Sequence, residues 1–189
     1  MGQRLDVAVT VPKSGGAFPI LARREGARER TGIVLATAGA NIGKIALLSP
    51  QEAPLVTFDL EGRLTAAKPL AERPADRRYD VTLAGDMAKY SWALLGADAL
   101  KVKAGERIEI AMRNDTMMMH PMHLHGHAFQ VVELNGRKLR GARRDTLALP
   151  PMASATIAFD AVNPGRWAFH CHHLYHMASG MMAFVDYEA

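Results

Sequence analysis

Histidine is confined to two short windows of this chain, and the single cysteine lies inside one of them. The first window runs from His120 to His127 and the second from His170 to His176, and together they hold all eight histidines. Histidines that serve merely as polar surface residues should scatter along a chain. Imidazole and thiolate groups are frequent ligands of transition metals in proteins. The clustering therefore predicts a metal site to which both windows contribute.

The spacing inside the windows places ligands on two sides of one strand. Alternate residues of an extended strand point to the same face. His123 and His125 therefore share a face. By the same rule His170 and His172 point one way, while Cys171 between them points the other way. One short segment is thus able to ligate metals on both of its sides.

Four residues supply the ligand types of a blue copper site. They are one thiolate, two imidazoles and one thioether, from Cys171, His120, His176 and Met181. A trigonal thiolate and imidazole set with a weak axial thioether selects copper and transfers single electrons. The two histidines that flank the cysteine would then hold a second copper centre, joined to the first through the backbone. The pattern predicts an electron-transfer path.

A zinc site and a cysteine protease each fit less of this pattern. Zinc also accepts cysteine and histidine, but structural zinc sites usually gather several cysteines at finger-like spacing. A cysteine protease would pair Cys171 with one histidine and leave most of the remaining histidines without a role. A buried thiol among core histidines would not require this spacing. Copper accounts for both windows.

The two windows resemble the C-terminal copper signatures of multicopper oxidases, in particular bacterial laccase-like and copper-resistance oxidases. The resemblance implies ligands for three kinds of copper site. The type 1 copper would be bound by His120, Cys171, His176 and, axially, Met181, the first three being the catalytic residues. The type 2 copper would be bound by His123, and the type 3 pair by His125, His170 and His172. His127 and His173 receive no ligand role.

The resemblance also implies an activity. Family members take electrons one at a time at the type 1 site and reduce dioxygen to water at a trinuclear cluster. The resemblance therefore implies a copper-binding oxidoreductase with Cu(I) or a phenol as electron donor, located in the periplasm. The family's cluster needs two further His-x-His pairs from an earlier domain, and no histidine precedes His120. The type 2 and type 3 sites are only partly encoded.

Two functional hypotheses follow from this incomplete ligand set. In the first, the chain is the C-terminal part of a multicopper oxidase, completed by missing N-terminal domains or by a second chain and inactive alone. In the second, it is a standalone copper-binding or electron-transfer cupredoxin with no oxygen chemistry. Near the ligands, Asp115 and Asp145 are either acceptors that orient imidazoles or turn residues. The run Met117–Met119 either handles Cu(I) or fills the core.

Composition limits the remaining function classes. The chain has 189 residues and a net charge of +4, and its basic residues form no stripe interleaved with aromatic residues. No nucleic-acid partner is expected. No apolar run reaches the roughly 20 residues that a membrane-spanning helix needs, so no membrane association is expected. The first residues carry no recognisable secretory signal.

Short apolar runs bounded by turn residues predict an all-β chain, with a turn at Asn135-Gly136. With the resemblance, the fold class is a cupredoxin-like Greek-key β-sandwich, preceded by a few strands of an incomplete second cupredoxin domain. Strands are expected at 5–11, 18–22, 32–36, 79–83, 90–94, 99–102, 107–113, 128–134, 154–159, 167–170 and 182–187. Residues 1–40 would be closing strands of the preceding domain, 41–78 a linker or covering segment, and 79–189 the copper-binding domain.

Overall fold

The computed structural model describes residues 2–188 and is almost entirely β, which confirms the predicted fold class. The chain divides into two units, one formed by Leu5–Val56 and the other by Met1–Arg4 with Thr57–Ala189. Within the described residues no helix is long and apolar enough to span a membrane. Each unit is described by itself below.

The unit Leu5–Val56 contains one hairpin. Its strands β1 (Ala17–Arg23) and β2 (Arg30–Ala36) pair antiparallel. The prediction of a strand over 5–11 is wrong, because those residues form no ladder with another described strand. Many of the large apolar side chains of this unit are exposed, among them Val7, Ile33 and Leu47 at 71%, 68% and 78%. The unit buries little apolar surface.

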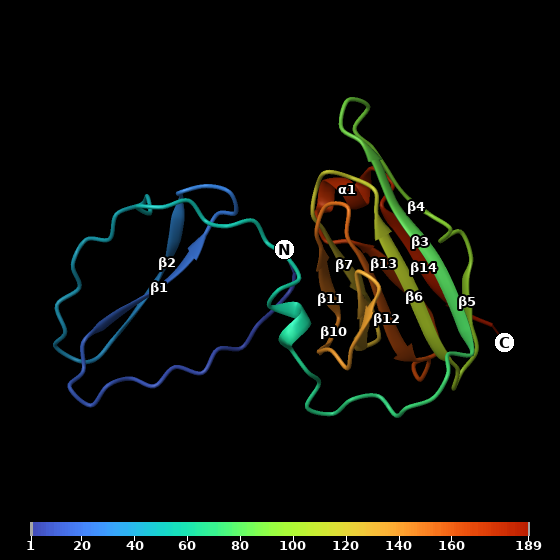
Figure 1. The fold of residues 1–189 in the computed structure, drawn as a ribbon, viewed down its shortest axis with the longest axis horizontal. Coiled ribbons are helices and arrows are strands. Elements are labelled where there is room, and N and C mark those ends of the chain that lie inside the picture. Colours follow the sequence, from blue (N-terminus) through green and yellow to red (C-terminus); the bar gives the residue numbers. More distant parts are fainter. Residues whose placement is uncertain (1, 189) are drawn as a thin grey trace. The chain divides into compact units, whose positions relative to one another are not determined.

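The larger unit is a sandwich of two sheets (Figure 1). The seven-stranded sheet has the order β10-β8-β12-β6-β3-β4, with β9 beside β8. Its strands are β3 (Arg77–Asp86), β4 (Ser91–Leu95), β6 (Arg107–Asn114), β8 (Phe129–Leu134), β9 (Arg137–Lys138), β10 (Arg143–Arg144) and β12 (Ser154–Asp160). Sequence neighbours are often not sheet neighbours, which is the mark of crossed connections between the two sheets.

The five-stranded sheet has the order β11-β7-β13-β14-β5. Its strands are β5 (Leu100–Val102), β7 (His120–Leu124), β11 (Thr146–Leu149), β13 (Arg166–Cys171) and β14 (Met182–Tyr187). Two short helices complete the unit, the 3-10 helix η1 (Glu61–Arg63) and α1 (Leu174–Ala178). The first has three residues and the second five, so each spans little more than one turn.

The core lies between the two sheets and is built from alternating inward-facing side chains. Ile108 and Ile110 of β6, Phe159 of β12 and Phe169 of β13 are completely buried in one apolar cluster. Cys171 belongs to the same cluster, with no exposed surface. The sequence-predicted turn is also present, since Asn135 and Gly136 have φ of 47° and 78° and join β8 to β9. A well-packed sandwich thus carries the residues with metal-ligand chemistry.

Candidate metal centre

His120, Cys171 and His176, here called the cysteine cluster, come together at one end of the sandwich. His120 begins β7 and Cys171 ends β13, and these strands pair with Cys171 opposite Met122. His176 reaches the same place from α1. The three residues have 0%, 0% and 5% exposed surface. Two paired strands and one short helix therefore fix three buried metal-binding groups.

The ligand atoms of the cysteine cluster form a triangle. Sγ of Cys171 lies 3.6 Å from Nδ1 of His120 and 3.8 Å from Nδ1 of His176, and the two nitrogens are 3.2 Å apart. In a trigonal site with metal bonds of about 2.0 Å to nitrogen and about 2.3 Å to sulfur, each nitrogen lies about 3.8 Å from the sulfur, and the two nitrogens lie about 3.5 Å apart. The triangle therefore fits one metal ion, and its atom types are those of a copper site.

Met181 is held beside this triangle by its backbone. Its N–H donates to the carbonyl of His176 at 2.9 Å, and its own carbonyl accepts from the N–H of Cys171 at 3.1 Å. The residue is completely buried. The chain thus returns to the cluster after α1 with a thioether residue next to two of the three other predicted ligands.

Thr116 fixes the orientation of the His120 ring. Its Oγ1 lies 2.8 Å from Nε2 of His120 and 2.8 Å from Oδ1 of Asn114, to which it donates. Nε2 must carry the proton when Nδ1 binds a metal, and it then donates to Oγ1. Asn114 in turn donates to the carbonyls of Met118 and Pro150, at 2.7 and 2.8 Å. This buried network directs Nδ1 of His120 toward the sulfur.

Burial shifts both kinds of group in the cysteine cluster toward their neutral forms. Burial raises the pKa of the Cys171 thiol to about 11. Burial, reinforced by the neighbouring imidazole of His176, lowers the pKa of His120 to about 4. Near neutral pH the metal-free cluster therefore holds a thiol and neutral imidazoles. Metal binding must release the thiol proton.

A second group, here called the histidine cluster, lies on the other side of the same strands. It consists of His123, His125 and His170, whose ligand nitrogens lie within 4.8 Å of one another. Nε2 of His125 is 3.0 Å from Nε2 of His170. The ring of His172 lies beside this group, with its centroid 5.6 Å from that of His123, nearly the distance of 5.5 Å between the rings of His123 and His170. The alternation predicted around Cys171 thus separates the cysteine from its two flanking histidines.

Asp145 contributes to this side mainly through its backbone. The Asp145 carbonyl lies 2.8 Å from Nδ1 of His123, whereas its carboxylate is 4.0 Å away and pairs with Arg4 at 2.5 Å. Oγ1 of Thr146 is also 3.0 Å from the same ring nitrogen. Asp115, the other carboxylate considered from the sequence, pairs with a neighbouring arginine at 2.6 Å. It touches neither cluster by any described bond.

His127 supports the turn that carries His125. The His127 ring is buried, with Nε2 2.7 Å from the Tyr187 hydroxyl and Nδ1 3.2 Å from the His125 carbonyl. Between the two histidines Gly126 has φ of 69°, and a Cβ there would lie 2.3 Å from the Trp167 ring. Only glycine fits this combination of conformation and close approach. His127 is therefore a structural neighbour of the histidine cluster.

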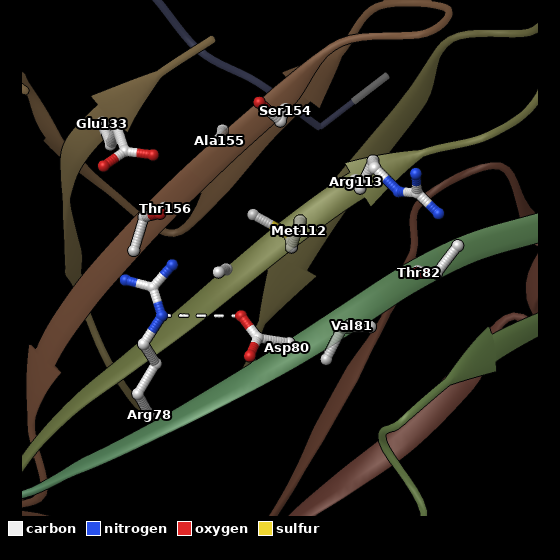
Figure 2. Close-up of a pocket in the computed structure, with 11 residues that line it drawn as sticks. Arg78, Asp80, Val81, Thr82, Met112, Arg113, Glu133, Ser154, Ala155 and Thr156 are labelled. Carbon is white, nitrogen blue, oxygen red and sulfur yellow. Dashed lines mark ion pairs between the residues drawn. The ribbon is translucent and has the colours of Figure 1, made fainter. Parts of the chain in front are cut away.

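A hollow elsewhere on the sandwich has different chemistry. It lies over β3, β6 and β12, and Figure 2 shows the ion pair between Arg78 and Asp80 at its edge, with N and O 3.5 Å apart. Its lining includes Glu133 and Thr156 but no residue of either cluster. The hollow is therefore not the candidate metal site, which is identified instead by the geometry of its ligand atoms.

Comparisons with known proteins agree with this geometry. The multicopper oxidase family profile matches residues 70–188, which include both clusters. The chain belongs to the multicopper oxidase family. Copper is accordingly its cofactor, and the family to which it belongs consists of copper-binding oxidoreductases.

Two curated relatives show how much of a multicopper oxidase is present. The chain is 37% identical to multicopper oxidase MmcO of Mycobacterium tuberculosis over 193 residues, 99% of this chain but 37% of that protein. It is 40% identical to copper resistance protein A of Escherichia coli over 121 residues, 61% of this chain and 20% of that protein. The chain thus spans well under half of these relatives.

Solved structures support the same fold. McoA multicopper oxidase from Aquifex aeolicus superposes with a TM-score of 0.55 at 26% identity, over 74% of this chain and 35% of that one. Fet3p, described as a multicopper oxidase that functions in iron import, gives a TM-score of 0.59 at 23% identity, over 77% of this chain and 38% of that one. The second likeness concerns the fold alone.

Proposed function

We propose that the cysteine cluster is the type 1 copper site of a multicopper oxidase and that this chain is the C-terminal, electron-accepting part of that enzyme. His120, Cys171 and His176 would hold the copper, and the thioether of Met181 would be a further ligand. Bound there, copper supplies one-electron transfer. The donor is Cu(I) or a phenol, and the buried position of the cluster keeps the thiolate away from water.

The observation that carries this proposal is the position of Cys171 between His170 and His172. The thiolate belongs to one cluster, and the two flanking imidazoles face the other side of the strand. Nδ1 of His170 lies 2.9 Å from the Cys171 carbonyl, which orients that ring. The covalent backbone therefore joins the electron-accepting side to the oxygen-reducing side within one residue.

His123 would serve the type 2 copper, and His125, His170 and His172 the type 3 pair. These four imidazoles are half of what the family's trinuclear cluster uses. We propose that missing N-terminal domains or a second chain supply two further His-x-His pairs. The partial exposure of His123 and His125 supports this, because their outer sides are accessible to such a partner. The periplasmic location implied by the resemblance belongs to the same proposal.

The second candidate is a standalone copper-binding or electron-transfer cupredoxin. It is favoured by the position of every histidine at or after His120, which leaves the trinuclear ligand set incomplete in these 189 residues. In this case the chain would take up one copper and exchange electrons without consuming dioxygen. The two candidates share the type 1 site and differ in oxygen chemistry.

Copper reconstitution separates the candidates. The chain is loaded with copper, the metal is counted, the visible spectrum is recorded, and dioxygen uptake is measured with Cu(I) and with a phenol. One copper, a blue band and no uptake in the chain alone are expected, with uptake restored when the missing histidine pairs are supplied. Continued absence of uptake in the completed protein would favour the cupredoxin. Absence of a blue band would contradict both.

A further inference from the structure

Trp92 lies against the cysteine cluster although it comes from the other sheet. It belongs to β4, the edge strand of the seven-stranded sheet. Its indole stacks on the His176 ring, with centroids 4.0 Å apart and planes inclined by 29°, and meets the His120 ring edge-on at 5.3 Å. Only 4% of Trp92 is exposed. One side chain thus packs against both imidazoles of the cluster.

Two glycines provide the space for this indole. Gly85 lies opposite Trp92 in the β3–β4 pair, and a Cβ on Gly85 would be 1.9 Å from Cε3 of the indole. A Cβ on Gly180 would be 2.2 Å from the Trp92 carbonyl oxygen. The Trp92 N–H donates at 3.0 Å to the carbonyl of Ser179, just after the helix that carries His176. Backbone contacts and glycine spacing therefore hold the ring in place.

Packing of the Trp92 ring, and not a hydrogen bond of its indole N–H, accounts for the buried position of this side chain. Among the described residues the buried indole N–H of Trp92 has no hydrogen-bond partner. Leaving such a donor unpaired costs about 1–3 kcal/mol, which the packing of the ring must offset. On the outer side Tyr90, 47% exposed, meets the indole edge-on with centroids 6.5 Å apart. Aromatic rings therefore run from an exposed residue to the cluster.

We propose that Trp92 is a positioning residue of the type 1 copper site, which holds the ring plane of His176 by stacking and keeps water away from it. This inference rests on the proposed copper site. A thiolate with Cu(II) carries one net positive charge, and a thiolate with Cu(I) carries none. Water stabilises the charged form more than the neutral one, so its exclusion favours the reduced state. Trp92 therefore raises the reduction potential.

The test compares copper-loaded variants of the chain. Trp92→Leu removes the stacked plane, and Gly85→Ala displaces the indole without changing it. Both are expected to keep one copper and a blue band, to lower the ratio of Cu(I) to Cu(II) affinity about tenfold, equivalent to about 59 mV, and to alter the electron paramagnetic resonance spectrum. Trp92→Phe keeps an aromatic plane and should recover most of the wild-type potential.

Matched controls separate this role from general packing. Trp167→Phe changes the other tryptophan, and Gly43→Ala changes a glycine whose added Cβ would meet nothing within 4 Å. Both should leave the potential unchanged. Wild-type potential and spectrum in Trp92→Leu or in Gly85→Ala would overturn the inference while leaving the copper site standing. Absence of a blue band in the unchanged chain would overturn the copper site and the inference together.

Discussion

Replacing Thr116 by valine should weaken copper binding without removing any ligand. Valine has nearly the shape of threonine, so the change removes one hydroxyl and little packing. When Nδ1 of His120 binds copper, Nε2 carries a proton that Thr116 Oγ1 accepts at 2.8 Å. His120 has no exposed surface, so water does not replace the lost acceptor.

The magnitude follows from the unpaired donor. An unsatisfied buried hydrogen-bond donor costs about 1–3 kcal/mol, and here the cost falls on the metal-bound state. Copper affinity should therefore decrease by about 5-fold to 150-fold, which brackets the effect usual for residues that support metal ligands. Asn114 keeps the backbone N–H of Thr116 as a donor to its Oδ1, at 3.0 Å, so the surrounding loop should remain folded.

The assay is a competition titration of copper against a chelator of known affinity. Thr116→Ser, which retains the hydroxyl, is the matched control and should bind copper nearly as tightly as the unchanged chain. Urea unfolding of the metal-free proteins shows whether the fold itself has changed. Equal copper affinity of Thr116→Val and the unchanged chain would refute the argument that this hydroxyl sets the tautomer of His120.

Three further predictions concern pH, the histidine turn and association. Copper affinity at the cysteine cluster should rise about tenfold per pH unit between pH 6 and 8, because copper binding displaces a proton from Cys171, whose pKa of about 11 lies above this range. His120, with a pKa of about 4, is already neutral there and releases no proton. A copper affinity that does not change with pH would contradict this. His127→Phe should lower the free energy of unfolding, measured in urea, by about 1–3 kcal/mol, because the Tyr187 hydroxyl loses its partner at 2.7 Å. The blue band should not change. Equal stability of the two proteins would count against a stabilising role of this hydrogen bond. The chain alone should self-associate in size-exclusion chromatography through the exposed apolar residues of 5–56, and Ile33→Lys should reduce this; a monomer in both cases would contradict it.

Local rules predicted the ligand side of the fold well. Strand alternation placed Cys171 opposite its flanking histidines, and the Asn-Gly turn at 135–136 needed only the preference of both residues for positive φ. The strand His120–Leu124 was absent from the expected strands, although His123 and His125 were treated as extended, because its histidines and proline obscure the apolar signal of a buried strand. The alternation around Cys171, the turn at 135–136 and the strand His120–Leu124 all depend on residues that are close together in the sequence.

Long-range packing was beyond the sequence argument. Leu5 to Val11 alternates like a strand, but a strand also needs a partner, and none of the described strands pairs with it. Trp92 precedes His176 by more than eighty residues and reaches it from the opposite sheet, so no spacing rule connects them. Thr116 lies four residues before His120, yet only the loop geometry shows that its hydroxyl meets the ring.

X-ray absorption at the copper edge tests the central claim most directly. The copper-loaded chain should show one short copper–sulfur distance together with two nitrogen neighbours, and Cys171→Ser should lose that sulfur contact and the blue band together. A short copper–sulfur distance that survives in Cys171→Ser, or a spectrum with nitrogen and oxygen neighbours alone in the unchanged chain, would contradict the assignment of Cys171 as the copper thiolate, because the thioether of Met181 gives at most a longer contact.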